Sequence, residues 1–257
     1  MFAERAFFSF TSIPDPTQHR AYNAWHQLDH RPENLALPGV VGGERWVHAP
    51  ACAAVSVAAP ELADLHYVNM YWFADPVARS VAAWEELAER SFQWGRRDDV
   101  HLARRLLMDH VRPLHGAVAP GVRLSPAALA FRPNRGIVLA VSRFAEPRTA
   151  AAERRYRWWQ DEYLPAHLGR DGVVGCWTFA GESNFAVHAD LAAGLPAPST
   201  RIAVFYVEDD PIEIAAGFAP VDDAPDVETV LFQGPLLAIV PWQWEWFDSA
   251  AGRGPAE

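Results

Sequence analysis

The stretch YNAWHQLDHRPENLALPGVVGGERW, residues 22–46, has a second version later in the chain, YRWWQDEYLPAHLGRDGVVGCW, at residues 156–177. Each version carries spaced aromatic residues, then a proline, then Gly-Val-Val-Gly and a predicted strand that reaches a tryptophan. The offset is 134 residues before the proline and 133 from the proline onward, so one residue has been gained or lost between them. A repeat of about half the chain has the size of a small domain. The matched pairs are Tyr22/Tyr156, Trp25/Trp159, Pro32/Pro165 and Gly39/Gly172.

Composition is compatible with two such domains in 257 residues, because half of the residues are apolar and 21% are charged. The net charge of −10 disfavours nucleic acid or an anionic membrane as the main partner, since both require a basic surface. Cys52 and Cys176 fall at unrelated places in the repeats and predict no shared disulfide or metal site. With no secretory signal or membrane-spanning run recognisable, we expect a cytoplasmic protein.

Periodicity predicts the same β-α-β-β-α-β order in both halves, which is the ferredoxin-like order. We predict a first repeat at 1–124, a linker at 125–136 and a second repeat at 137–257. A third helical stretch at 99–111 has no counterpart in the second half, and 52–65 is predicted to be a variable loop. The predicted strands are 6–12, 40–48, 66–74, 112–124, 136–144, 173–180, 201–207 and 236–247, and the predicted helices are 17–36, 76–94, 149–168 and 211–218, with a loop at 194–200.

One face of each predicted sheet is covered by two helices, and the other is left bare. In the strand at 66–74, Tyr67, Asn69 and Tyr71 alternate with the apolar residues of the opposite face. The aromatic strands make the bare face too apolar for water. We therefore expect an α+β protein in which the two sheets pack face to face as an intramolecular barrel, with the pocket between the sheets.

The first repeat resembles the dimeric α/β-barrel superfamily, and within it the EthD-like group, through Trp25, His30, Pro32 and Pro38-Gly39. The second repeat keeps the tryptophan, the proline and the glycine but has Tyr163 where the family has histidine. Relatives of this architecture include cofactor-free monooxygenases, lactone isomerases, polyketide cyclases and haem enzymes. The resemblance implies the fold and a tandem arrangement, and it does not choose among these activities.

His30 is the predicted catalytic residue, because a histidine near the end of the first helix can point into the barrel as a general base. Its direction stays open: the stripe Ala21, Trp25, Leu28, Pro32 and Leu35 faces away from His30 on an ideal helix, whereas a proline can distort the turn. Tyr163, which replaces this histidine in the second repeat, is the second catalytic candidate. His26 and His30 are four residues apart and could hold a metal, but a polar outer face explains the same spacing, and we predict no metal site.

The predicted ligand-binding residues are aromatic side chains on the two helical stripes and on the third and last strands, an asparagine between tyrosines, and an arginine at a helix end. A hydrophobic core is the more usual explanation for the helical aromatics, and complementing the helix C-terminus is the more usual explanation for the arginine. These residues are Tyr22, Trp25, Tyr67, Asn69, Tyr71, Arg96, Trp159 and Trp244.

The leading hypothesis for function is a small enzyme that acts on a hydrophobic, aromatic or polyketide-like molecule by proton transfer or cofactor-free oxygenation. The alternatives are a non-catalytic small-molecule binding protein and a haem protein, for which His110 and His115 are as eligible as His30. No phosphate-binding loop and no nucleophile elbow is present in the sequence. We expect no cofactor and either a monomeric fused barrel or a homodimer.

Overall fold

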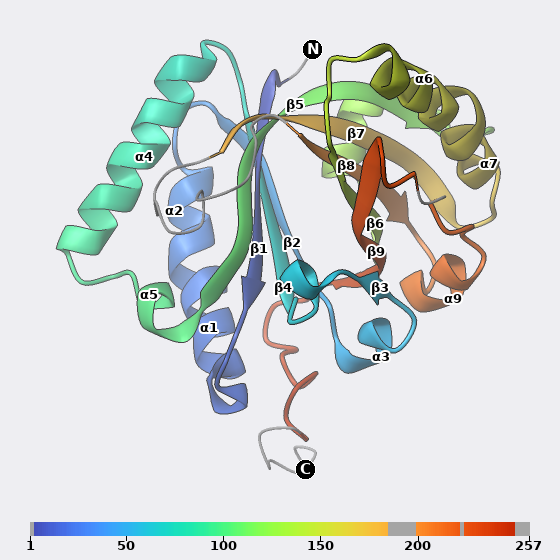
Figure 1. Cartoon of the computed structure of the whole chain (residues 1–257). Coiled ribbons are helices and arrows are strands. Elements are labelled where there is room, and N and C mark those ends of the chain that lie inside the picture. The colour runs from blue at the N-terminus through green and yellow to red at the C-terminus, as the bar shows by residue number, and fades with distance from the viewer. Residues whose placement is uncertain (1–2, 185–198, 222–223, 250–257) are drawn as a thin grey trace.

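The computed structural model describes residues 3–184, 199–221 and 224–249 (Figure 1). The strands are β1 Arg5–Ser12, β2 Val40–Val47, β3 Val57–Ala58, β4 Tyr67–Phe73, β5 Arg104–Val118, β6 Gly136–Phe144, β7 Val173–Asn184, β8 Thr200–Val207 and β9 Glu228–Ala238. The helices are α1 His19–Trp25, α2 Arg31–Leu35, α3 Pro50–Ala53, α4 Val77–Gln93, α5 Asp99–Leu102, α6 Ala150–Trp158, α7 Leu164–Leu168 and α9 Pro211–Ala216. Single-turn segments are η1 Pro16–Gln18, η2 His26–His30, η3 Pro60–Leu62, η4 Pro126–Phe131 and η5 Trp159–Tyr163.

The strands form one antiparallel sheet in the order β2-β4-β1-β5-β7-β8-β6-β9-β3, and β2 also pairs with the end of β9. That last pairing closes the sheet into a barrel. Helices α1, α2 and α4 cover one outer side, and α6, α7 and α9 cover the opposite side (Figure 1). The four strands of each half have the same order, and the long pair β5–β7 joins the halves. The protein is therefore α+β with a large antiparallel sheet.

The barrel interior is filled with side chains, so the prediction of a pocket between the two sheets is wrong. Phe8 contacts Phe179 across the interior, with ring centroids 5.2 Å apart, and Trp72 contacts the same ring at 5.2 Å. All three belong to one buried cluster drawn from both halves. The predicted alternation in β4 is confirmed, because Val68, Met70 and Trp72 face this interior while Tyr67 and Tyr71 pack on the helix side.

Two predicted elements are wrong, the helix at 99–111 and the strand at 236–247. Each concerns the last strand of its half. The stretch 99–111 is helical only in α5, and β5 begins at Arg104 because it pairs along its length with both β1 and β7. Long-range pairing overrides the local helical spacing here. The last strand is β9, not 236–247. The chain leaves the sheet after Ala238, and Trp242 has φ 72°, which no strand residue adopts.

Both helical stripes contain a π-helical turn, η2 and η5, which ends two residues before a proline. The proline ring clashes with the carbonyl four residues earlier, and the helix accommodates it by widening by one residue. Accordingly, Arg31 N–H donates to the His26 carbonyl, and Leu164 N–H donates to the Trp159 carbonyl. The predicted stripe is wrong, because Leu28 is 50% exposed and Ala21, which precedes the π turn, is exposed as well. The buried residues of α1 are His19, Tyr22, Asn23 and Trp25.

The Gly-Val-Val-Gly motifs are helix-to-strand turns in both halves. Gly39 and Gly172 have φ 105° and 80°, the region that residues with a Cβ rarely adopt. The predicted linker contains η4, whose Leu129 is fully buried in the barrel cluster, and the predicted loop at 52–65 contains α3, β3 and η3. Residues 194–198 of the predicted loop lie outside the described residues. Within the described residues no helix combines the length and the apolar character that a membrane span requires.

Candidate functional site

A cavity of the first half lies on the helix side of the sheet, between the outer face of β1, β4 and β5 and the helices α1, η2, α4 and α5. Its volume is about 520 Å³. The alternation of β1 and β4 places short polar and aromatic side chains on this face, since the apolar set faces the barrel interior. Five of the predicted site residues line this cavity: Tyr22, Trp25, His30, Asn69 and Tyr71.

Aromatic rings form much of the wall. His30 stacks on Trp25, with ring centroids 4.6 Å apart and planes at 18°, and contacts His26 edge-on at 5.1 Å. On the other side Trp84 of α4 packs against Phe7 of β1, at 4.8 Å. The residues Trp25 and His30 are five apart, and a regular α-helix would turn them to different sides. The π turn therefore decides the open question of His30: its ring lies in the cavity.

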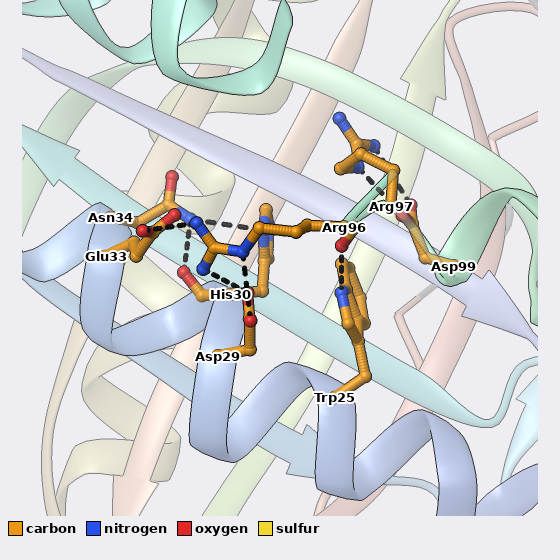
Figure 2. A network of polar contacts seen from close by, with 8 residues as sticks. All are labelled: Trp25, Asp29, His30, Glu33, Asn34, Arg96, Arg97 and Asp99. Carbon is orange, nitrogen blue, oxygen red and sulfur yellow. Dashed lines mark hydrogen bonds and ion pairs between the residues drawn. The ribbon is translucent and has the colours of Figure 1, made fainter. Parts of the chain in front are cut away.

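A network outside the cavity holds Trp25 in place (Figure 2). Trp25 Nε1 donates to the carbonyl of Arg96 at 2.7 Å. The Arg96 guanidinium in turn binds Asp29 through two hydrogen bonds of 2.8 and 3.2 Å and binds Glu33 at 2.6 Å. These contacts tie the loop after α4 to η2 and α2. Arg96, predicted as a ligand-binding residue, positions Trp25 instead, and its side chain does not line this cavity.

The hydrogen bonds of Asn34 indicate which nitrogen of His30 carries the proton. Asn34 Nδ2 donates to the His30 carbonyl at 2.5 Å, which fixes the orientation of the amide, and lies 3.3 Å from His30 Nδ1 (Figure 2). An NH₂ group facing Nδ1 favours Nδ1 as acceptor, so the neutral ring carries its proton on Nε2. Burial, and after it the charge of Arg97, lowers the pKa of His30 to about 3. The ring is therefore neutral at pH 7 and offers an N–H donor.

Two arginines share one carboxylate at the edge of the cavity. Arg97 binds Asp99 through hydrogen bonds of 2.8 and 3.0 Å, and Arg105 binds the same carboxylate. Burial alone would raise the pKa of Asp99, but the two guanidinium groups outweigh it and lower that pKa. Asp99 therefore stays ionised, and the cluster of Arg97, Asp99 and Arg105 keeps one positive charge in excess.

Arg45 of β2 lies behind the cavity floor. Its Nε donates to Asn69 Oδ1 at 2.8 Å, and its guanidinium carbon lies 5.2 Å from the ring centroid of Tyr22 and 5.0 Å from that of Tyr67. The residue is 5% exposed. Neither Nη1 nor Nη2 has a hydrogen-bond partner among the described residues. Burial lowers the pKa of Arg45, and its charge in turn depresses the pKa of both His26 and His30.

The second half has a cavity in the matching place, under α6 and η5, but its volume is only about 50 Å³. Tyr156, Trp159 and Arg201 line it. Fully buried Glu228 of β9 accepts from Trp159 Nε1 at 3.1 Å and pairs with Arg155. Arg155 is thus paired within the chain, the guanidinium carbon of Arg201 lies 4.7 Å from the ring centroid of Tyr156, and little space is left.

Three further predicted residues lie outside these two cavities. Tyr67 is fully buried, with its hydroxyl 2.9 Å from His19 Nδ1. Trp244 donates from Nε1 to Gln27 at 2.9 Å, on the outside of η2. Tyr163 occupies the last position of its π turn, as His30 does in the first half, but its hydroxyl donates to the Ala219 carbonyl at 3.1 Å.

Sequence reasoning missed Asp99, Arg105 and Trp84, which line the cavity, and Arg45, which lies behind its floor. Strand alternation could have found Arg45, because it falls on the face opposite Glu44 and Trp46. Asp99 and Arg105 were assigned to a helix, so their approach to His30 was not foreseeable. Within the described residues no group of three or more His, Cys, Asp or Glu side chains is arranged to hold a metal ion.

Comparison with known proteins shows the fold. No protein-family model matches the chain, and no curated protein matches its sequence. Solved structures do match, and one is a candidate monooxygenase from Fusobacterium nucleatum, with a TM-score of 0.55 and 7% sequence identity over 93% of this chain and 94% of that one. An encapsulated DyP-type peroxidase from Mycobacterium smegmatis matches with a TM-score of 0.55 and 8% identity over 93% of each chain. An anthrone oxidase-like protein matches with a TM-score of 0.51 and 9% identity over 93% of this chain and 92% of that one. The chain thus has a dimeric α/β-barrel-type fold.

Proteins with this type of fold include haem proteins, so haem is the cofactor to consider. The hydrogen bonding of the cavity histidines does not suit a haem ligand. A histidine that ligates a metal through Nε2 donates its Nδ1–H to an acceptor. His30 Nδ1 faces the amide NH₂ of Asn34, and His26 Nδ1 has no partner among the described residues. His110 packs between Phe7, Phe73 and Trp84 and does not line the cavity, and His115 is exposed on β5.

Proposed function

We propose that the chain is a fused pair of ferredoxin-like repeats, residues 1–124 and 137–257 joined by 125–136, that forms a barrel without a second subunit. The shared strand order and the two π turns at an offset of 133 residues support this. Fusion allows the halves to differ, since neither has to serve as its own partner. The first half keeps an open cavity and the second has filled its own with Trp159 and Glu228.

The first-half cavity is the active site of a small enzyme that acts on an aromatic or polyketide-like molecule without a cofactor. The observation that carries this proposal is the neutral His30 ring, fixed by Asn34 and Trp25, in an aromatic cavity of about 520 Å³. Preorganised donors that face a developing negative charge supply much of the catalytic effect in such sites. The fold permits many other chemistries, so the argument depends on this site.

The step we assign to the site is loss of a proton from an acidic C–H or O–H, which gives an enolate or phenolate. His30 Nε2–H donates a hydrogen bond to the oxygen on which the negative charge develops, and the positive groups Arg45, Arg97 and Arg105 favour that charge. The proton leaves through the mouth of the cavity to water. Protonation at another carbon completes an isomerisation. Reaction of the anion with O₂ completes an oxygenation, in which a CH₂ group becomes C=O and the second oxygen atom leaves as water.

Anthrone is a suitable first substrate, since it is a planar tricyclic ketone with an acidic CH₂ group and one structural neighbour is an anthrone oxidase-like protein. We expect the purified protein, without added cofactor or metal, to accelerate O₂-dependent formation of anthraquinone, followed by absorbance and by oxygen consumption. The protein itself should show no Soret band. Tight binding without product would favour the alternative, a binding protein, and a Soret band would contradict the assignment of a cofactor-free site.

A further inference from the structure

We propose that the cavity binds its substrate through an ionised oxygen acid, with Arg45, behind the floor, as the counter-charge. The ligand class is a planar aromatic molecule that carries a carboxylate, or a phenol or enol acidic enough to ionise on binding. This inference deepens the proposed function, since it specifies the substrate of the same site. It rests on the charges and contacts of the site rather than on the reaction.

The first observation is a buried positive charge without a carboxylate. Arg45 is 5% exposed, its Nη1 and Nη2 have no partner among the described residues, and its neighbours are the neutral groups Asn69, Tyr22 and Tyr67. A buried charge without a paired partner is strongly destabilising. Such an arrangement persists where a ligand supplies the missing charge.

The second half offers a comparison, because there a partly buried arginine is paired with a buried carboxylate. Arg155 is paired with the fully buried Glu228, which also accepts from Trp159 and Ser142. All the partners of that carboxylate come from the chain. The first half has the larger cavity where the second has this carboxylate arrangement.

The third observation is that other polar groups around the floor are also incomplete. Tyr71 Oη and His26 Nδ1 are buried without partners among the described residues. After burial, the charge of Arg45 is the next influence on the pKa of each group, and it lowers both pKa values. At the edge of the cavity, Arg97 and Arg105 share Asp99 alone, with side chains 15% and 12% exposed. Among the buried and half-buried charged groups, three guanidinium groups face one carboxylate, whereas Glu85 and Glu89 of α4, which also line the cavity, are exposed. An anion in the cavity would meet an excess of positive charge and unused donors, while the rings of Trp25 and Trp84 contact its aromatic plane.

The test compares 2-naphthoate with 2-naphthamide, its neutral isostere, by isothermal titration calorimetry. We expect the wild-type protein to bind the anion at least about tenfold more tightly, because hydrogen bonds to charged groups contribute more than neutral ones. Arg45→Met should weaken naphthoate binding by about 10–150-fold and leave naphthamide binding unchanged. Arg132→Met, which removes an exposed arginine paired with Glu208, is the matched control and should bind both probes as the wild type does.

Thermal unfolding of the Arg45→Met variant gives a second readout. If Arg45 has only a structural role, the variant should melt at a lower temperature than the wild type, which is opposite to the change expected here. Replacing an unpaired buried charge by an isosteric apolar side chain should raise the melting temperature of the ligand-free protein, by about 2–4 °C or more. A lower melting temperature, equal affinity for the two probes, or no naphthoate binding at millimolar concentration would overturn the inference. Charge-selective binding that depends on Arg45, in a protein that does not oxidise anthrone, would retain the inference and refute the proposed reaction.

Discussion

His30→Ala is expected to lower kcat/KM for anthrone oxidation by about 10²–10³-fold, the usual cost of removing one donor to a developing oxyanion. His30→Gln should cost less than about tenfold, because its amide N–H can reach the place of Nε2–H, whereas an amide cannot act as a base. His115→Ala, an exposed histidine of β5, is the control and should have wild-type activity. The measurement is steady-state kinetics, with circular dichroism to show that each variant is folded.

The His30→Gln variant separates the donor role from the general-base role predicted from sequence. If glutamine is as damaging as alanine, His30 acts as a base and the assignment made from Asn34 is wrong. The pH profile gives independent evidence. With a His30 pKa of about 3, the ring stays neutral from pH 5 upward and should add no ionisation to the wild-type profile in that range.

Asn34→Asp should change both the tautomer and the charge of His30. A carboxylate next to Nδ1 accepts a proton from it and favours the imidazolium, so the pKa of His30 rises toward and above its ordinary value. The activity of this variant should change as the pH falls through the new pKa of His30. The wild type should show no such change in that range of pH. ¹⁵N NMR of the imidazole would detect the change of tautomer directly. An unchanged NMR signature would contradict the Asn34 contact.

The architecture was predictable from sequence because repetition and alternation act locally. The paired motifs around Trp25 and Trp159, the alternation in β4 and the glycines at positive φ all depend on neighbouring residues. The wrong predictions concern segments whose conformation depends on strand pairing with residues far away in the sequence. The segment beginning at Arg104 is a strand because β1 and β7 lie on either side of it, and the chain after Ala238 has no strand partner in the described sheet.

The site was only half predictable for a similar reason. Tyr22, Trp25, Asn69 and Tyr71 could be named because helical and strand periodicity places them on one face. The direction of His30 depended on a π turn, which shifts every later side chain by one residue and which ideal helical geometry does not include. The location of the cavity depended on whether side chains from the two inner sheet faces fill the barrel interior. Large rings such as Phe8, Trp72 and Phe179 do fill the interior, which leaves the helix side as the place for a ligand.

Phe179→Ala is expected to destabilise the whole chain by about 3–5 kcal/mol, the usual cost of removing a buried phenylalanine ring. The ring is fully buried on β7 and contacts Phe8 and Trp72 of the first half, so the cavity left behind borders both halves and cannot close by movement of one alone. Urea denaturation should show one shifted transition with an unchanged slope, whether it is followed by tryptophan fluorescence or by circular dichroism. Phe131→Ala removes a ring that is 58% exposed and should change the free energy of unfolding by less than about 0.5 kcal/mol. Two separate transitions, with only the second half destabilised, would show that the halves fold independently, and the shared interior would then not hold the barrel together.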